Sequence, residues 1–159
     1  VSIPRFDKLA DRRLPESAWE RVARADLVVF EGWFLGTPAE SPEALVQPVN
    51  ALERDEDPDG LWRRHCNEAL ARDYPSLWSR IDRLLLLEAP AFEVVPEWRW
   101  EQECAAQARN AADPGMDRAQ CDRFVQHYER VSRQALRTLP ARVDLRVRLD
   151  AQRSPRIAA

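Results

Sequence analysis

The stretch DRLLLLEAPAFEVVPEWRWEQECAAQARNAA, residues 82–112, joins a short apolar run to a long helical segment. Leu84–Leu87 is continuously apolar rather than alternating, which is typical of a parallel strand buried on both faces. The residues from Ala91 onward predict a long helix. A strand followed directly by a helix is the unit from which α/β proteins are built. This stretch therefore favours the α/β class.

Outward from this stretch, the chain repeats the same alternation. Leu27–Phe30 predicts a second buried strand, and Val1–Ile3 a partial one. Leu145–Leu149 alternates, so we expect an edge strand with one wet face. The expected helices cover residues 15–25, residues 59–81 with a break at Pro75, and residues 117–139, capped by Asp117 and stopped by Pro140. The prediction is a parallel sheet with flanking helices in a single domain, residues 1–159.

Composition excludes several classes of function. The chain has 159 residues, 45% of them apolar, and a net charge of −3, so it has no basic surplus to hold nucleic acid. Its apolar runs are too short to span a membrane, and no secretory signal precedes them. The three cysteines form no metal-binding spacing with His65 or His127, and we expect free thiols in a reducing cytoplasm. The acidic residues 53–60 predict a solvated loop.

Candidate chemistry lies where the expected strands end, because ligands of open α/β sheets bind outside the carboxyl ends of the strands. Asp7 can orient or deprotonate a hydroxyl, and Lys8 and Arg13 can bind an anion. Glu31, at the end of the 27–30 run, can hold Mg²⁺ through oxygen. Taken singly, Asp7–Lys8 also fits an ordinary charged turn and Glu31 a solvent-facing acid. Together, on neighbouring strands, they fit phosphoryl transfer.

Five blocks, PRFDKLADRR, FEGWFLG, PVNALERDEDPDGLWRRHCNEAL, WRWEQE and GMDRAQCDRFVQHYERVSRQAL, give the chain a family resemblance. In this order and spacing they resemble the later two-thirds of D-glycerate 3-kinases of the P-loop type, relatives of uridine kinase, phosphoribulokinase and pantothenate kinase. The resemblance covers about residues 3–150. It implies a P-loop kinase fold, use of ATP and Mg²⁺, and a small hydroxy acid as acceptor, with D-glycerate favoured.

The resemblance also implies roles for single residues. Glu31 matches the acid near Mg²⁺, and Asp7 matches the base that takes the proton of the acceptor hydroxyl. Lys8 and Arg13 match basic positions that meet the substrate carboxylate or the travelling phosphate. Arg99 matches an arginine of a lid, here residues 96–117, that reaches the nucleotide phosphates. Further positions match without an assigned role: Asn50, Glu53, Trp62, Arg63, Asn67, Gln102 and Glu103.

The chain departs from the family pattern in two places. Arg12 stands where the family often has an acid, which changes the local charge. More importantly, the Gly-x-x-x-x-Gly-Lys-Ser/Thr loop is absent from this sequence, whose single lysine is Lys8. That loop would follow a central strand between the strand of Glu31 and Leu84–Leu87. We therefore expect a C-terminal portion of a kinase-like fold, with a missing N-terminal segment, that by itself binds ATP poorly and has no turnover.

Three interpretations stay open at this point. The chain is part of a truncated kinase, part of a kinase split over two chains, or a non-catalytic kinase-like remnant that serves as a binding module. In the first two cases the partners are ATP and a small hydroxy acid. Neither nucleic acid nor a membrane is expected as a partner in any of the three.

Overall fold

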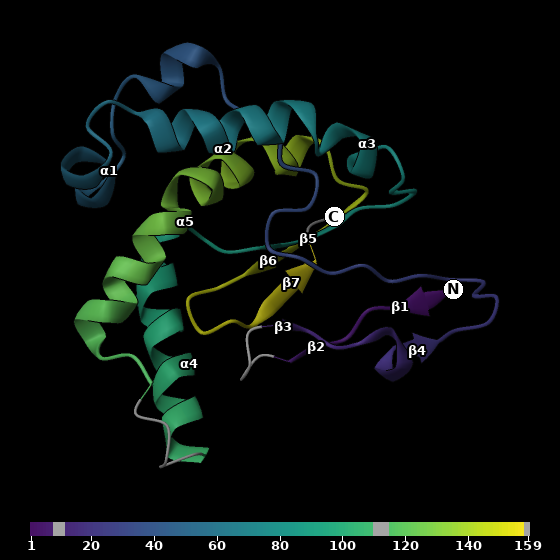
Figure 1. Cartoon of the computed structure of the whole chain (residues 1–159). Helices are drawn as coiled ribbons and strands as arrows, with labels where there is room; N and C mark the ends of the chain where they lie inside the picture. The colour runs from purple at the N-terminus through teal and green to yellow at the C-terminus, as the bar shows by residue number, and fades with distance from the viewer. Residues whose placement is uncertain (8–11, 110–114, 158–159) are drawn as a thin grey trace. The chain divides into compact units, whose positions relative to one another are not determined.

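The computed structural model describes residues 1–7, 12–109 and 115–157 (Figure 1). The chain divides into two compact units, Val1–Gly32 and Trp33–Ala159. Lys8 lies outside the described residues.

The first unit consists of two small antiparallel ribbons. Strand β1 (Ser2–Ile3) pairs with β4 (Glu20–Arg21), and β2 (Phe6–Asp7) pairs with β3 (Arg12–Arg13). The expected helix over residues 15–25 is wrong. One turn of 3₁₀-helix, η1 (Glu16–Ala18), forms after Pro15, and the chain then enters β4, whose pairing with β1 replaces the helical hydrogen bonds.

The predicted strand Leu27–Phe30 is also wrong. The run has no regular secondary structure, and Leu27, Val28 and Val29 are 80%, 78% and 84% exposed. Among the described residues, the strand pairings link other segments and leave this run out. A strand is stabilised by its ladder and by packing of its faces, so an apolar run with neither stays irregular.

The sheet of the second unit has three strands in the order β5 (Leu85–Glu88), β6 (Leu145–Leu149) and β7 (Pro155–Ile157). The strand predicted at Leu84–Leu87 is confirmed with a shift of one residue, but it is not buried on both faces, since Leu85 and Leu87 are 52% and 62% exposed. β5 and β6 are parallel, with Leu85 opposite Leu145, as expected. However, β6 is central rather than an edge strand, because β7, which the sequence analysis missed, pairs with it antiparallel.

Helices flank this sheet, so the α/β prediction is confirmed (Figure 1). Pro75 separates two helices as predicted, and Asp117 accepts from the backbone N–H of Gln120 in a capping box. A short helix occupies part of the expected loop 53–60. The helical segments are η2 (Pro42–Leu45), α1 (Ala51–Glu56), α2 (Leu61–Arg72), α3 (Pro75–Trp78), η3 (Phe92–Val94), α4 (Val95–Arg109), α5 (Arg118–Thr138) and η4 (Leu139–Ala141).

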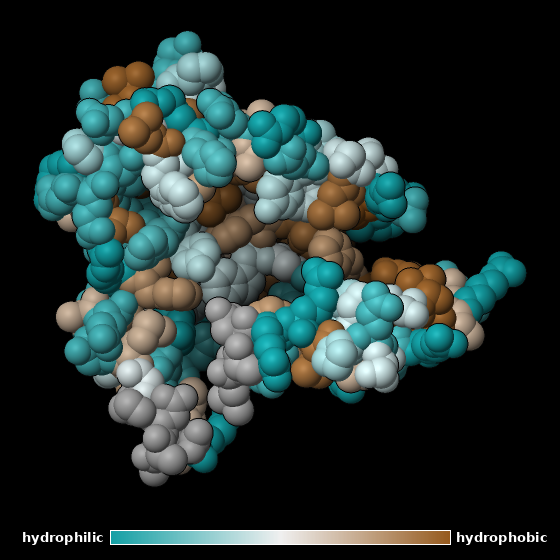
Figure 2. Space-filling model, viewed as in Figure 1, coloured by the Kyte–Doolittle hydropathy of each residue, from teal (hydrophilic) through white to brown (hydrophobic). Residues whose placement is uncertain are grey.

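The core of the second unit is built around α5. Cys121, Val125 and Ala135 of this helix are buried, together with Leu139 just beyond it. Leu45 from η2 and Phe92 from η3 complete the buried apolar set. Helices α4 and α1 both pack against α5. The outer surface of α2 is mostly hydrophilic in Figure 2, consistent with a helix that covers this core on one side.

Candidate functional site

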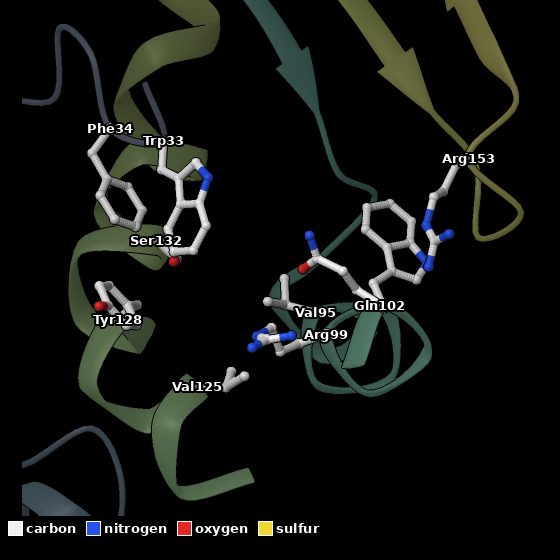
Figure 3. Close-up of a pocket in the computed structure, with 10 residues that line it drawn as sticks. Trp33, Phe34, Val95, Arg99, Gln102, Val125, Tyr128, Ser132 and Arg153 are labelled. Atoms are coloured by element: carbon white, nitrogen blue, oxygen red, sulfur yellow. The ribbon is translucent and has the colours of Figure 1, made fainter. Parts of the chain in front are cut away.

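The second unit contains a cavity of about 460 Å³ between α4 and α5. Figure 3 shows Trp33, Phe34 and Tyr128 on one side of it, and Arg99, Gln102 and Arg153 on the other. Helix α4 follows the carboxyl end of β5, and Arg153 follows the carboxyl end of β6. The cavity thus lies where α/β sheets place their ligands. It is lined by Trp33, Phe34, Val95, Trp98, Arg99, Gln102, Val125, Tyr128, Ser132 and Arg153.

One wall of the cavity is aromatic. Tyr128 meets Trp33 edge-on, with ring centroids 5.5 Å apart, and stacks with Phe34 at 6.2 Å. The ring of Phe124 lies 5.0 Å from that of Tyr128. Positions 124 and 128 are four residues apart on α5, so their side chains lie on the same face of the helix. The Trp33 ring stands at 77° to Tyr128 and at 89° to Phe34, so the cluster offers apolar ring faces in two orientations, each able to stack with a planar group.

Arg99 is held in place on the opposite wall. Its guanidinium pairs with Glu103 one helical turn later at 2.7 Å, and lies 5.3 Å above the ring of Phe124. Glu103 also accepts a hydrogen bond of 2.9 Å from the backbone N–H of Met116. That backbone bond, followed by the contact with Arg99, holds the pKa of Glu103 below its ordinary value. The carboxylate therefore stays charged and joins the middle of α4 to the segment before α5.

Arg153 reaches the cavity from the turn between β6 and β7. Its guanidinium carbon lies 5.2 Å from the ring centre of Trp98, and the side chain pairs with Glu101. The turn is tied to α4 a second time, because the indole N–H of Trp98 donates to the carbonyl of Ala151 at 3.0 Å. Two tryptophan contacts and an ion pair thus fix where this arginine points.

A largely shielded ionic cluster fastens the segment before α2 to α5. Arg130 pairs with Glu53 at 2.6 Å and with Glu40 at 3.1 Å, and the three side chains are 8–13% exposed. Burial lowers the pKa of Arg130, but the hydrogen bonds from Glu53 and Glu40 outweigh it, so the net shift is upward. Asn50 adds a hydrogen bond of 2.9 Å to the carbonyl of Gln126. This cluster positions the chain that leads into the helices.

The residues that the sequence matched to the family without a role make the following contacts in the structure. Glu53 and Asn50 belong to the fastening just described, and Glu103 supports Arg99. Arg63 is buried and donates 2.7 Å hydrogen bonds to the carbonyls of Leu45 and Asp57. Asn67 holds both backbone groups of Glu40, at 2.7 and 3.0 Å. Trp62 is 67% exposed and stacks with His65. Gln102 lines the cavity.

The other predicted site residues lie in the first unit. Asp7 stands opposite Arg12 in the β2–β3 ribbon, and the side chain of Arg13 lies 6.0 Å from the ring of Trp19. Glu31 is exposed and follows the irregular run 27–30. Lys8 falls outside the described residues. Arg99 belongs to the second unit. The roles of Asp7, Lys8, Arg13 and Glu31 remain predictions.

The described residues contain no group of three or more His, Cys, Asp or Glu side chains able to hold a metal. Glu31 therefore remains a proposed ligand rather than part of an assembled metal site. Its exposed carboxylate is chemically suitable, since Mg²⁺ prefers oxygen ligands and takes one or two carboxylates together with substrate phosphates.

The cavity contains residues that sequence reasoning missed. Arg153 lies in a segment with no motif, so no sequence signal identified it. Tyr128 belongs to the block FVQHYER, but its 3.6-residue spacing suggested only a core position. Trp33 belongs to the block FEGWFLG, in which Glu31 was the only candidate that its position at a strand end selected. Their convergence depends on the packing of α5 against α4.

A second, more open hollow of about 390 Å³ lies beyond β5. Its charged groups are already paired: Arg133 with Glu93 and Glu129, and Arg137 with Glu40. Hydrogen bonding by Arg133 also lowers the pKa of Glu93. Glu88 and Glu93 also line this hollow, whereas no carboxylate is among the described residues that line the cavity between α4 and α5, so the hollow is less suited to an anionic ligand.

The fold is similar to that of a solved D-glycerate 3-kinase. The chain superimposes over 100% of its length on D-glycerate 3-kinase from Cryptococcus neoformans var. grubii serotype A, with a TM-score of 0.74 and 20% identity, and covers 59% of that chain. It is also 35% identical over 136 residues to mug58, an uncharacterized kinase of Schizosaccharomyces pombe. The matched region covers 80% of this chain and 47% of the relative. The predicted resemblance is confirmed.

The chain spans about half the length of this curated relative. No protein-family profile matches it. Among the described residues, no helix is long and apolar enough to cross a membrane. The cysteines Cys66, Cys104 and Cys121 are all free thiols, as predicted.

Proposed function

We propose that the protein transfers the γ-phosphoryl group of ATP to a small hydroxy acid, with D-glycerate as the favoured acceptor. The observation that carries the proposal is the likeness of the whole chain to a D-glycerate 3-kinase fold. The kinase relative in Schizosaccharomyces pombe supports the same reaction class. The arginine-lined cavity at the carboxyl side of the parallel strands supplies a place for an anionic ligand.

In this proposal each predicted site residue has one task. Asp7 orients or deprotonates the attacking hydroxyl, and Glu31 holds Mg²⁺, which would neutralise charge on the phosphates. Lys8 and Arg13 meet the substrate carboxylate or the moving phosphate. Arg99, in the lid 96–117, neutralises phosphate charge, for which a fixed guanidinium is well suited. The free thiols support a location in the reducing cytoplasm.

The 159-residue chain by itself is proposed to be inactive. Its sequence has no Gly-x-x-x-x-Gly-Lys-Ser/Thr loop to cradle the β- and γ-phosphates. Incubation of the isolated chain with ATP, Mg²⁺ and D-glycerate should therefore yield no 3-phosphoglycerate. Product formed at a rate proportional to the chain's concentration would overturn this part of the proposal.

The kinase proposal itself is tested in a protein that joins this chain to a P-loop segment. Reading the DNA upstream of Val1 shows whether such a segment is in frame, in a neighbouring frame or absent. With it, Asp7→Asn should lower kcat by about 10²-fold or more while ATP affinity changes little. Near-normal turnover would remove Asp7 from the base role. Failure to phosphorylate any small hydroxy acid would overturn the proposed function.

A second candidate function is a non-catalytic kinase-like module that binds a protein partner. The observation that favours it is the exposure of the apolar run Leu27–Val29. Exposed apolar stretches of this kind often mark interaction sites. The turnover measurement described above decides between the two candidates, because a non-catalytic module would transfer no phosphoryl group even when joined to a P-loop segment.

A further inference from the structure

We infer that the cavity between α4 and α5 binds the nucleotide rather than the acceptor acid, and that Arg153 is one of its ligand-contacting residues. The inference rests on the proposed kinase function and specifies which of the two substrates this cavity takes. It also adds a residue that lies outside every recognised sequence block.

The backbone of Arg153 is the first sign of a specialised role. Its φ is 62°, in the left-handed region that a residue with a long side chain rarely adopts. The turn maintains this conformation: Asp150 accepts from the backbone N–H groups of Gln152 and Ser154 at 3.0 and 2.8 Å, and Arg153 donates to the carbonyl of Asp150 at 2.9 Å. Glycine would adopt this φ without strain, yet the position carries an arginine. Strained residues held by their surroundings cluster at ligand sites.

The guanidinium of Arg153 is held but keeps donors for a ligand. It lies over Trp98 and pairs with Glu101 through Nη2. Arg99 similarly uses Nη2 for Glu103. A guanidinium has five N–H donors, so one carboxylate contact leaves others able to reach into the cavity. Both arginines line the cavity, and Figure 3 shows them on the side opposite the aromatic residues.

The chemistry of the two walls fits a nucleotide. A base can stack on one ring face of the aromatic wall, such as that of Trp33, which is 65% exposed, because base–aromatic stacking is favourable for any base. Phosphates can meet Arg99 and Arg153 in charge-assisted hydrogen bonds. D-glycerate has three carbons and no planar ring, so it would leave most of a 460 Å³ cavity and the whole aromatic wall without contact.

The chain offers a matched control for Arg153. Arg118 lies 5.9 Å from the ring centre of Trp100 and pairs with Glu97 at 2.8 Å, so it makes the same two kinds of contact with α4. Unlike Arg153, it is not among the residues that line the cavity. Substitution of Arg118 therefore reports the loss of an ordinary stacked ion pair.

The test is a titration of the full 159-residue chain with ADP, followed by tryptophan fluorescence and calorimetry. We expect binding in the millimolar range, because the phosphate loop is not in this chain. Arg153→Gly should weaken ADP binding by at least about fivefold, since a charged hydrogen-bond donor is lost. Its melting temperature should remain near that of the parent chain, because glycine tolerates the left-handed turn. Arg118→Ala should leave the ADP affinity within about twofold.

Partial ligands sharpen the result. Adenosine tests the aromatic wall and tripolyphosphate tests the arginines, and each should bind more weakly than ADP. Arg153→Gly should reduce binding of tripolyphosphate but change binding of adenosine little. Arg153→Lys, which keeps the charge, should recover part of the ADP affinity.

Unchanged ADP binding by Arg153→Gly, or no ADP binding up to about 10 mM, would overturn the inference. Binding of D-glycerate that depends on Arg153 would overturn it too, by assigning the cavity to the acceptor. None of these results would contradict the proposed function, which is measured by turnover in a protein that also carries a P-loop. Conversely, ADP binding that depends on Arg153 would stand even if D-glycerate proved not to be the acceptor.

Discussion

Both units of the chain contain apolar runs, but among the described residues only the second unit has buried apolar side chains. In Trp33–Ala159, residues such as Val125 and Leu139 are 5% and 3% exposed, and they surround α5. In Val1–Gly32, no described residue is buried, and the apolar run 27–30 is largely exposed. The presence of an apolar run is therefore not sufficient for its burial. A run is buried where other elements pack against it, and the second unit supplies those elements.

Charged residues differ in the same way between the units. In the second unit, the side chain of Arg130 is only 12% exposed and lies between two carboxylates, whereas Arg13 in the first unit is exposed. Removing one partner of a buried ion pair leaves an uncompensated charge, which costs much more than the loss of a surface pair. The comparison can thus be tested by matched substitutions in the two units.

The largest effect is expected for Arg130→Ala. It leaves the largely buried carboxylate of Glu53 without its cation and Glu40 with Arg137 alone, and should lower the free energy of unfolding by about 3–5 kcal/mol. Arg13→Ala should change it by about 0.5 kcal/mol or less. Urea unfolding followed by circular dichroism measures both. Equal effects of the two substitutions would refute the difference between the units.

Leu139→Ala should come next. The side chain is 3% exposed, and truncating a buried leucine costs about 2–5 kcal/mol through lost burial and a residual cavity. The control is Leu27→Ala, at a position that is 80% exposed, where we expect about 0.5 kcal/mol or less. A cost above about 2 kcal/mol at Leu27 would mean that the 27–30 run is buried in solution.

A smaller and pH-dependent effect is expected at Glu103. Glu103→Ala leaves the N–H of Met116 without its acceptor and should cost about 1–3 kcal/mol at neutral pH. The folded state depresses the pKa of this carboxyl from its ordinary value of 4.5. Its ionic contribution is therefore complete above that value and lost as the pH falls through the depressed one.

The difference in stability between the parent chain and Glu103→Ala should consequently shrink as the pH drops below about 4.5. Glu103→Gln keeps an acceptor for Met116 but cannot ionise, so its difference from Glu103→Ala should not change over the same range. A constant difference between parent and Glu103→Ala from pH 7 to pH 3 would contradict the role given to the charge.

The smallest effect belongs to the cap of α5. Asp117→Ala removes the side-chain acceptor for the N–H of Gln120 and should cost about 1 kcal/mol, while Asp117→Asn should restore most of it. Thermal unfolding of the three chains checks the order. An alanine variant as stable as the parent would show that the capping box contributes nothing measurable here.

Local sequence signals predicted the elements that depend on local physics. The cap at Asp117, the break at Pro75 and the strand 84–87 all follow from residues within a few positions of one another, and all three are confirmed to within a residue. The sequence blocks also identified the kinase-like fold and selected Arg99, which lines the cavity.

Tertiary structure decided what depends on distant partners. β6 became central because β7 pairs with it, and the run 27–30 stayed irregular because no described segment pairs with it. The cavity brings together Trp33, Tyr128 and Arg153, of which Trp33 is more than 90 residues from the other two in sequence. The packing of α4 against α5 and the strained turn after β6 make this possible. Sequence fixes which residues have the capacity for such contacts, whereas packing selects which of them meet.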